Sequence, residues 1–249
     1  MINIRKIKFL RRKSIFGKLI RLPFKLIPAQ ATLTIFAGPL KGRKWIKGSH
    51  NISVWLGRYE IKQTKLFVQE SKQKKVLWDL GAHVGYYSLL FKSQNEDSKV
   101  YAFEPVLKNV KLLQNHLTMN SIEGVAVFQK AVSNELGTLK FNSSRTSVAG
   151  KLHIEGDIEV EVIKLSFFLE NETIASPDII KMDIEGEELK VLKDLQLLLA
   201  RQKPIIFLST HGKDVHDQCC VFLKSIGYDL LPLDADNLAQ SREIFCQSL

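Results

Sequence analysis

The chain has few of the residues on which several protein classes depend. Its 249 residues include only three cysteines, 14 glycines and seven prolines. So little glycine and proline exclude collagen-like and low-complexity chains. The odd cysteine count, with Cys219 and Cys220 adjacent, argues against a disulfide framework. We therefore expect a globular protein with reduced thiols, the usual state of cysteines in the cytoplasm.

A long hydrophobic run is missing too. No apolar stretch approaches the roughly 18–20 residues that a membrane-spanning helix needs, and residues 1–28 lack the uninterrupted apolar core of a secretory signal. These residues mix basic and apolar side chains, a pattern that favours anionic lipid. We expect a cytoplasmic protein with peripheral contact to the inner membrane surface through residues 1–28. A solvated basic arm, a lead-in helix and an organellar transit peptide stay open as alternatives.

Acidic residues are absent from the start of the chain, where the first is Glu60. Residues 1–50 hold 13 of the 36 lysines and arginines, which leaves 23 basic residues against all 26 acidic ones in the remainder. The net charge of +10 therefore belongs to the N-terminal segment, and the main body has a net charge of −3. Nucleic-acid enzymes more often spread basic charge over a binding face, so this distribution counts against a DNA or RNA substrate.

Turn signals and hydrophobic periodicity divide the chain into three parts. We expect a basic segment at 1–28, a β-hairpin and helix cap at 29–72, and a cofactor-binding domain at 73–249. The cap is predicted to contain extended runs at 32–36, 44–46 and 53–56 and a helix at 59–70. In the domain, strands are predicted at 76–80, 100–103, 125–128, 138–141, 159–163, 179–182, 205–209 and 228–231. Helices are predicted at 85–92, at 105–119, through Leu189, Leu192, Leu195 and Leu199, and up to Gly227.

The alternation of apolar strands with helices predicts an α/β fold. Strands that are apolar almost throughout are typical of a mostly parallel sheet covered by helices on both faces. Ligands of such sheets bind at the carboxyl ends of the strands, where the strand order reverses. Chemistry-bearing residues are therefore sought directly after the predicted strands.

The loop after the strand at 76–80 reads DLGAHVG over residues 79–85. Dinucleotide-binding loops need a central glycine as well, because a pyrophosphate sits against the helix N-terminus. Here Ala82 and His83 occupy that stretch. S-adenosylmethionine has no pyrophosphate, and a strand-end carboxylate such as Asp79 can meet its ammonium group. The loop therefore favours S-adenosylmethionine over a nicotinamide cofactor.

A second carboxylate, Glu104, follows the next predicted strand, 25 residues after Asp79. A strand-end acid at this place can accept both ribose hydroxyls of a nucleoside cofactor. The structural alternative is an aspartate that closes a loop and a glutamate that caps a helix, without a ligand. Loop and acid together favour the cofactor interpretation more than the glycine loop does alone.

Three blocks of sequence resemble the FkbM-type family of class I S-adenosylmethionine-dependent methyltransferases. They are DLGAHVGYYS at 79–88, VYAFEP at 100–105 and IIKMDIEGEE at 179–188, with the resemblance covering about residues 38–230. It implies a Rossmann-like class I methyltransferase fold that binds S-adenosylmethionine. It also implies O-methylation of a hydroxyl on a sugar, a glycolipid or a secondary metabolite, with a small-molecule, glycan or glycolipid acceptor.

The resemblance also implies roles for individual residues. Asp79, Gly81, His83 and Gly85 would surround the methionine part of the cofactor, Glu104 would bind its ribose, Ala131 and Val132 would flank its adenine, and Asp183 and Glu185 would face the sulfonium and the acceptor. The chain departs from the family's pattern at Leu165-Ser166 and at Ser209-Thr210-His211, where an acid is common.

Methyl transfer to a hydroxyl requires the loss of a proton, so a base near neutral pKa helps. His211 is the preferred base because imidazole titrates in the useful range, with Asp183 and Glu185 as further catalytic candidates. Two neighbouring acids require positive charge nearby, from the cofactor, Lys181 or a metal, and we expect the cofactor. A simple pair between Lys181 and Glu185 stays open as an alternative. These residues could ligate Mg²⁺, but they are not a diagnostic set, so no metal is expected.

Three other functions stay open at this point. The basic N-terminus suggests an RNA methyltransferase, and the glycine loop suggests an NAD(P)-binding oxidoreductase. Either feature is also compatible with a non-catalytic protein that binds a cofactor or a membrane surface. Acceptor specificity is expected in the cap and in residues 143–157, whose sequence does not reveal the acceptor.

Overall fold

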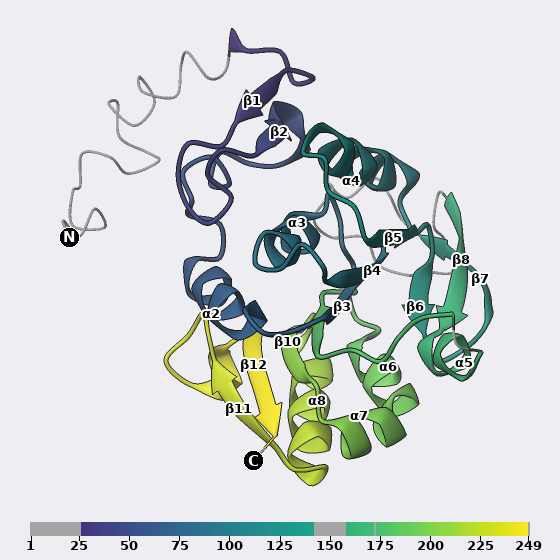
Figure 1. Ribbon diagram of the computed structural model, residues 1–249. Helices are drawn as coiled ribbons and strands as arrows, with labels where there is room; N and C mark the ends of the chain where they lie inside the picture. Colours follow the sequence, from purple (N-terminus) through teal and green to yellow (C-terminus); the bar gives the residue numbers. More distant parts are fainter. Residues whose placement is uncertain (1–25, 142–157, 172, 249) are drawn as a thin grey trace.

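The computed structural model describes residues 26–141, 158–171 and 173–248 (Figure 1). Most of the predicted basic segment and the whole of the predicted specificity stretch at 143–157 lie outside these residues. Within the described ranges, no helix is both long enough and apolar enough to cross a membrane.

The cap contains the expected hairpin and helix. Strands β1 (Thr32–Thr34) and β2 (Lys44–Ile46) pair antiparallel, a 3-10 turn follows at Lys47–Ser49, and α2 spans Ile61–Ser71. The strand expected at 53–56 is wrong. This stretch forms successive turns with one isolated bridge between Ala37 and Leu56, because the turns bury both Val54 and Trp55, whereas a strand would send them to opposite faces.

The central sheet has seven strands in the order β11-β12-β10-β9-β3-β4-β5. Their bounds are β3 Val76–Leu80, β4 Lys99–Phe103, β5 Val125–Phe128, β9 Ile179–Met182, β10 Ile205–Ser209, β11 Tyr228–Pro232 and β12 Glu243–Ser248. Pairs along β10, β9, β3, β4 and β5 are parallel, and β12 runs antiparallel to both neighbours. The mostly parallel sheet is confirmed, and β12 is the one strand of it that the sequence did not predict.

A second, three-stranded sheet lies beside the first. It has the order β6-β8-β7, with β6 Ala131–Ser133, β7 Gly137–Phe141 and β8 Ile158–Lys164. The sequence predicted β7 and β8 but not β6, whose three residues are too few for a periodicity signal.

Helices cover both faces of the central sheet, as expected (Figure 1). They are α3 Tyr86–Lys92, α4 Leu107–Met119, α5 Leu165–Glu170, α6 Glu188–Asp194, α7 Gln196–Gln202 and α8 Lys213–Ser225, with a 3-10 turn at Leu238–Gln240. The leucine-rich helix predicted after β9 is two helices, because the chain leaves helical geometry at Leu195. The short helix α5 was not predicted.

Alternate residues of each strand enter different cores. Leu77 packs with the cap, α3 and α4, whereas Trp78 packs with α6, α7 and α8. The cap therefore shares its core with one face of the sheet. Gly227 has a positive φ of 86° and ends α8 as expected, and all three cysteines are free and buried.

His116 joins the cap to the domain. Its Nε2 accepts the Ile46 amide at 3.1 Å, its Nδ1 lies 2.9 Å from the Val84 carbonyl oxygen, and its ring stacks on Trp45 at 3.9 Å. The side chain is fully buried, and burial lowers the pKa of His116 to about 4. A neutral imidazole thus connects β2, α4 and the glycine loop.

Candidate functional site

A row of buried polar residues crosses the carboxyl end of the sheet on the cap side. Asp79 of β3 is in register with Lys181 of β9, and Ser209 of β10 with Glu243 of β12. The Lys181 ammonium donates to Ser209 Oγ at 2.7 Å, and Ser209 Oγ donates to Glu243 Oε2 at 2.7 Å. Four neighbouring strands therefore contribute one continuous polar surface beneath the cap.

The glycine loop lies directly against the end of β9. A Cβ atom built on Gly81 would stand 1.9 Å from the Asp183 carbonyl oxygen, so only glycine fits there. Gly81 and Gly85 have positive φ angles, and so does His83 at 49°. This loop geometry brings the predicted cofactor residues of β3 next to the predicted catalytic residues that follow β9.

Asp79 is almost fully buried and accepts one side-chain hydrogen bond, from Ser88 Oγ at 2.6 Å. Burial raises the pKa of Asp79 to about 6, although Ser88 and Lys181 act in the opposite direction. Since burial opposes ionisation here, a cationic group brought next to this carboxylate would stabilise its charged form.

Glu104 is buried as well and holds the glycine loop in place. Its Oε2 accepts the His83 amide at 2.9 Å, and its Oε1 accepts the Val106 amide at 3.0 Å and Asn109 Nδ2 at 3.1 Å. Burial raises the pKa of Glu104 to about 7, despite these three hydrogen bonds. A carboxylate has about four acceptor positions, so Glu104 keeps capacity for a further donor beyond its structural role.

Ala131 and Val132, the residues expected beside the adenine, are buried in β6. Val132 belongs to the core shared with Phe103, and Ala131 to a small cluster with Val160 and Val162. Both positions are thus packed against protein, and their contact with an adenine stays a prediction.

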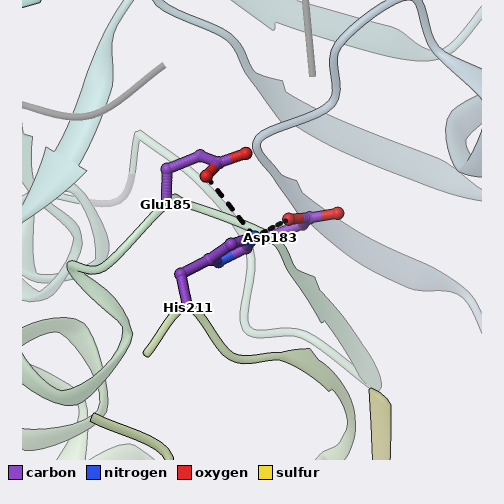
Figure 2. Close-up of side chains that lie close together, drawn as sticks. All are labelled: Asp183, Glu185 and His211. Atoms are coloured by element: carbon purple, nitrogen blue, oxygen red, sulfur yellow. Dashed lines mark ion pairs between the residues drawn. The ribbon is translucent and has the colours of Figure 1, made fainter. Parts of the chain in front are cut away.

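The three predicted catalytic residues meet at the ends of β9 and β10 (Figure 2). His211 Nε2 lies 3.5 Å from Asp183 Oδ1 and 3.4 Å from Glu185 Oε2. Figure 2 shows both carboxylates directed at this one ring nitrogen. All three side chains are partly exposed, at 35% for Asp183, 17% for Glu185 and 26% for His211, so they remain accessible to a ligand.

The other ring nitrogen of His211 contacts an acid that the sequence argument did not single out. His211 Nδ1 lies 2.8 Å from Glu188 Oε1, and the side chain of Glu188 is fully buried. Burial lowers the pKa of His211, but the hydrogen bond to Glu188 and the charges of Asp183 and Glu185 outweigh it, so the pKa is raised above 6.5.

Lys181 supplies positive charge on the far side of Asp183. It is buried, and its Nζ lies 3.6 Å from Asp183 Oδ2. Lys181 therefore pairs with Asp183 rather than with Glu185, because Asp183 directly follows β9 whereas Glu185 lies two residues further along the loop. Burial alone would lower the pKa of Lys181, but nearby carboxylates, Asp183 first among them, raise it.

Asp183, Glu185 and His211 are also the group of residues, among those described, that could hold a metal ion. One ligand atom from each lies within 4.8 Å of the others. Two carboxylate oxygens and an imidazole nitrogen suit a divalent cation. A protonated imidazole also balances the two acids, so this geometry alone does not require a metal.

Cap residues reach the same region. Glu60, at the start of α2, accepts Tyr87 Oη at 2.6 Å and Gln63 Nε2 at 2.9 Å. Tyr59 packs edge-on against His50, with ring centroids 4.6 Å apart. Sequence reasoning gave these residues no role, because a contact between the cap and α3, such as that between Glu60 and Tyr87, leaves no periodic signal.

Backbone strain gathers at the same place. Among the described residues, five non-glycine residues have a positive φ, and Glu60, His83 and Glu185 are three of them. Such conformations cost of order 1–3 kcal/mol each and are concentrated at ligand-binding sites. The strain thus marks the cap, the glycine loop and the β9 loop as parts of one site.

Comparison with known proteins gives the family. The model of the methyltransferase FkbM domain matches residues 79–230. The hexuronic acid methyltransferase AglP of Haloferax volcanii is 27% identical over 158 residues, which cover 61% of this chain and 63% of AglP. Methyltransferase sdnD of Sordaria araneosa is 28% identical over 150 residues, 46% of this chain and 58% of that protein.

The alignments therefore span about six-tenths of these relatives. Among solved structures, methyltransferase FkbM from Methylobacillus flagellatus KT is 18% identical, with 80% of this chain and 55% of that chain covered and a TM-score of 0.49. Since the FkbM domain model covers more than half of the sequence, the chain belongs to the FkbM methyltransferase family.

Proposed function

We propose that the protein is an S-adenosylmethionine-dependent methyltransferase that methylates a hydroxyl group of a small-molecule or glycan acceptor. The observation that carries the proposal is the contact between the glycine loop at Gly81 and the Asp183 backbone. This contact supports the proposal because the glycine loop, which we propose binds the cofactor, then lies next to His211 and its two acids. The proposed division is a cap at 29–72 and a cofactor-binding domain at 73–249.

The residues fit S-adenosylmethionine by their chemistry. Asp79 and Glu104 are buried carboxylates whose pKa values burial raises to about 6 and about 7. We propose that Asp79 meets the cofactor's ammonium, that Glu104 accepts its ribose hydroxyls, and that Gly81, His83, Gly85, Ala131 and Val132 line the rest. When bound, the cofactor supplies a methyl group on a sulfonium that is already activated for in-line displacement.

His211 would act as the base. Its Nε2 would take the proton of the acceptor hydroxyl as that oxygen bonds to the methyl group that the cofactor would supply. Asp183 and Glu185, at 3.5 and 3.4 Å from Nε2, stabilise the imidazolium that results. Asp183 also faces Lys181, so its position is fixed from both sides.

The charge of the site favours an uncharged acceptor. Six carboxylates lie close to or act electrostatically on Lys181 or His211, those of Glu60, Asp79, Asp183, Glu185, Glu188 and Glu243. An acidic sugar would be repelled by this excess of negative charge, whereas neutral hydroxyls can donate to it. We therefore propose a neutral polyhydroxylated acceptor, unlike the hexuronic acid in the name of AglP.

The first test is binding of the cofactor. Calorimetry with S-adenosylmethionine and NADH side by side should show heat with the former alone. The variant Glu104→Ala should weaken S-adenosylmethionine binding by about 1.5–3 kcal/mol, the range for a hydrogen bond to a charged group. Unchanged affinity in a folded Glu104→Ala protein would refute the ribose assignment, and binding of NADH instead would favour an oxidoreductase.

The second test concerns the metal. Methyl transfer to a panel of neutral sugars should continue in EDTA and should fall strongly in Asp183→Asn without loss of the fold. Activity that EDTA abolishes and Mg²⁺ restores would make Asp183 a metal ligand. Full activity of Asp183→Asn would make this acid structural.

The N-terminal segment is proposed to contact anionic membranes, on the basis of its 13 basic residues and absence of acids over positions 1–50. Deletion of residues 1–28 should leave cofactor binding intact and weaken retention on anionic vesicles, since each basic residue near the surface contributes roughly 1 kcal/mol. Equal retention with and without the segment would discard this part of the proposal.

A further inference from the structure

We propose that Glu188 is the positioning residue of this site. Its carboxylate holds His211 in the tautomer with a proton on Nδ1, and thereby directs the lone pair of Nε2 toward the acceptor hydroxyl. This inference rests on the proposed function, in which His211 is the base. It assigns a role to a fully buried acid that faces the ring from the start of α6.

The hydrogen bonds of Glu188 define the tautomer. Its Oε1 accepts the backbone amide of Gly186 at 3.0 Å and lies 2.8 Å from His211 Nδ1. An oxygen that already accepts a backbone N–H is placed as an acceptor for the ring as well, so Nδ1 is the donor. The proton of a neutral imidazole is then on Nδ1, and Nε2 carries the lone pair.

The two nitrogens of the His211 ring have contacts of different length. On the Nδ1 side the contact to Glu188 is 2.8 Å, whereas the contacts of Nε2 to Asp183 and Glu185 are 3.5 and 3.4 Å. The first is a short hydrogen bond, whereas the other two are ion-pair contacts beyond the usual length of an N–H···O hydrogen bond. Glu188 therefore orients the ring, while Nε2 can exchange its loose contacts for the acceptor.

Stability alone does not account for Glu188. Its second oxygen, Oε2, is buried and has no hydrogen-bond partner among the described residues. A buried acceptor without a donor destabilises a fold, and burying a carboxylate has a further cost. From α8, Cys219 adds no positive charge, and burial raises the pKa of that thiol to about 12. An acid at position 188 is explained by what it does to His211.

The test compares Glu188→Gln with Glu187→Gln. Both changes remove one negative charge at the start of α6, but the Glu187 carboxylate pairs with Lys190 at 3.0 Å and not with the ring. Glu188→Gln should lower kcat by on the order of 10²- to 10⁴-fold and leave the KM for S-adenosylmethionine unchanged. Glu187→Gln should retain kcat.

A second readout does not depend on turnover. Nitrogen NMR of His211 at alkaline pH, where the imidazole is neutral, should show the proton on Nδ1 in the wild type and a mixture of tautomers in Glu188→Gln. A proton on Nε2 in the wild type would overturn the proposal, even if the variant failed to fold. Unchanged kcat in folded Glu188→Gln would overturn it too. If no acceptor is methylated but the tautomer changes as expected, the proposed function fails and the positioning by Glu188 stands.

Discussion

Two histidines of this protein, one fully buried and one partly exposed, have opposite surroundings. His116, between the cap and α4, contacts a backbone amide, a backbone carbonyl and the face of Trp45, and its pKa falls to about 4. His211, at the end of β10, faces three carboxylates, and its pKa is raised. Burial acts on both in the same direction, so the difference comes from the charge of the partners.

The comparison shows how one residue type serves two purposes. A neutral histidine with uncharged partners works as a rigid connector, because protonation would remove the lone pair that accepts the Ile46 amide. A histidine among acids can gain a proton at little cost, which is what a base must do during turnover. The following predictions test each side of this contrast.

The largest effect is expected at His211. Replacement of His211 by glutamine keeps a polar side chain but removes the base, and should lower kcat by on the order of 10²- to 10⁴-fold. The melting temperature should change little, because His211 is partly exposed. Steady-state kinetics and thermal unfolding measure the two quantities. A variant that keeps its activity would move the role of base to another group.

Protonation of His116 should destabilise the fold in acid. The folded-state pKa of about 4 lies below the ordinary value of 6.5, so the unfolded chain binds the proton more tightly and stability is lost as pH falls from 6.5 toward 4. The shift corresponds to about 3 kcal/mol in the free energy of unfolding. Urea unfolding at pH 7 and pH 4.5 measures it.

The matched control is His116→Gln, which keeps a polar group but does not titrate. Its stability should depend less on pH than that of the wild type over this range, because the other groups that titrate are common to both proteins. Identical pH dependence of the two proteins would contradict the connector role of His116.

The buried carboxylates extend the contrast to acids. Burial raises the pKa of Asp79 to about 6 and of Glu104 to about 7, and only the charged forms bind an ammonium and hydroxyls well. The affinity for S-adenosylmethionine should therefore rise by on the order of tenfold from pH 6 to pH 7.5, with release of protons on binding. Calorimetry in buffers of different ionisation enthalpy detects this release. Proton uptake would contradict the assignment.

The smallest effect is expected from the charge of the acceptor. A neutral hexose or the methyl ester of a hexuronic acid should be methylated about five- to tenfold better than the free acid, because charge repulsion at a partly hydrated site amounts to about 1 kcal/mol. The difference should shrink in high salt. A preference for the free acid would show that a cation of the chain reaches the acceptor.

Sequence patterns predicted the parts of the structure that local order controls. Four strands of the central sheet have the predicted bounds, namely β3, β5, β9 and β10, because continuous apolar runs between turn signals leave little freedom. Strand β12 was not predicted. It lies between β10 and the edge strand β11, and this position depends on pairing with distant segments.

The site was predictable to the same extent. The motifs placed Asp183, Glu185 and His211 at strand ends, and the structure brings them together. The partners that define their chemistry did not follow from the motifs. Glu188 is the last residue of the IIKMDIEGEE block, but only the helix geometry of α6 turns it toward His211. Glu60 contacts Tyr87 only because the cap folds against α3.

The missing side chain at Gly81 has a consequence for how variants of this protein are interpreted. The loop that begins with Gly81 and the backbone of Asp183 touch without a side chain between them. Any larger residue at position 81 would push the two loops apart and displace Asp183 along with the cofactor loop. Such a variant would lose cofactor affinity and turnover together, and a mutational scan would record position 81 as both a binding and a catalytic residue although it contributes no functional group. The loss of activity on substitution of Gly81 would then reflect the close approach of two loops and not a chemical role of the residue.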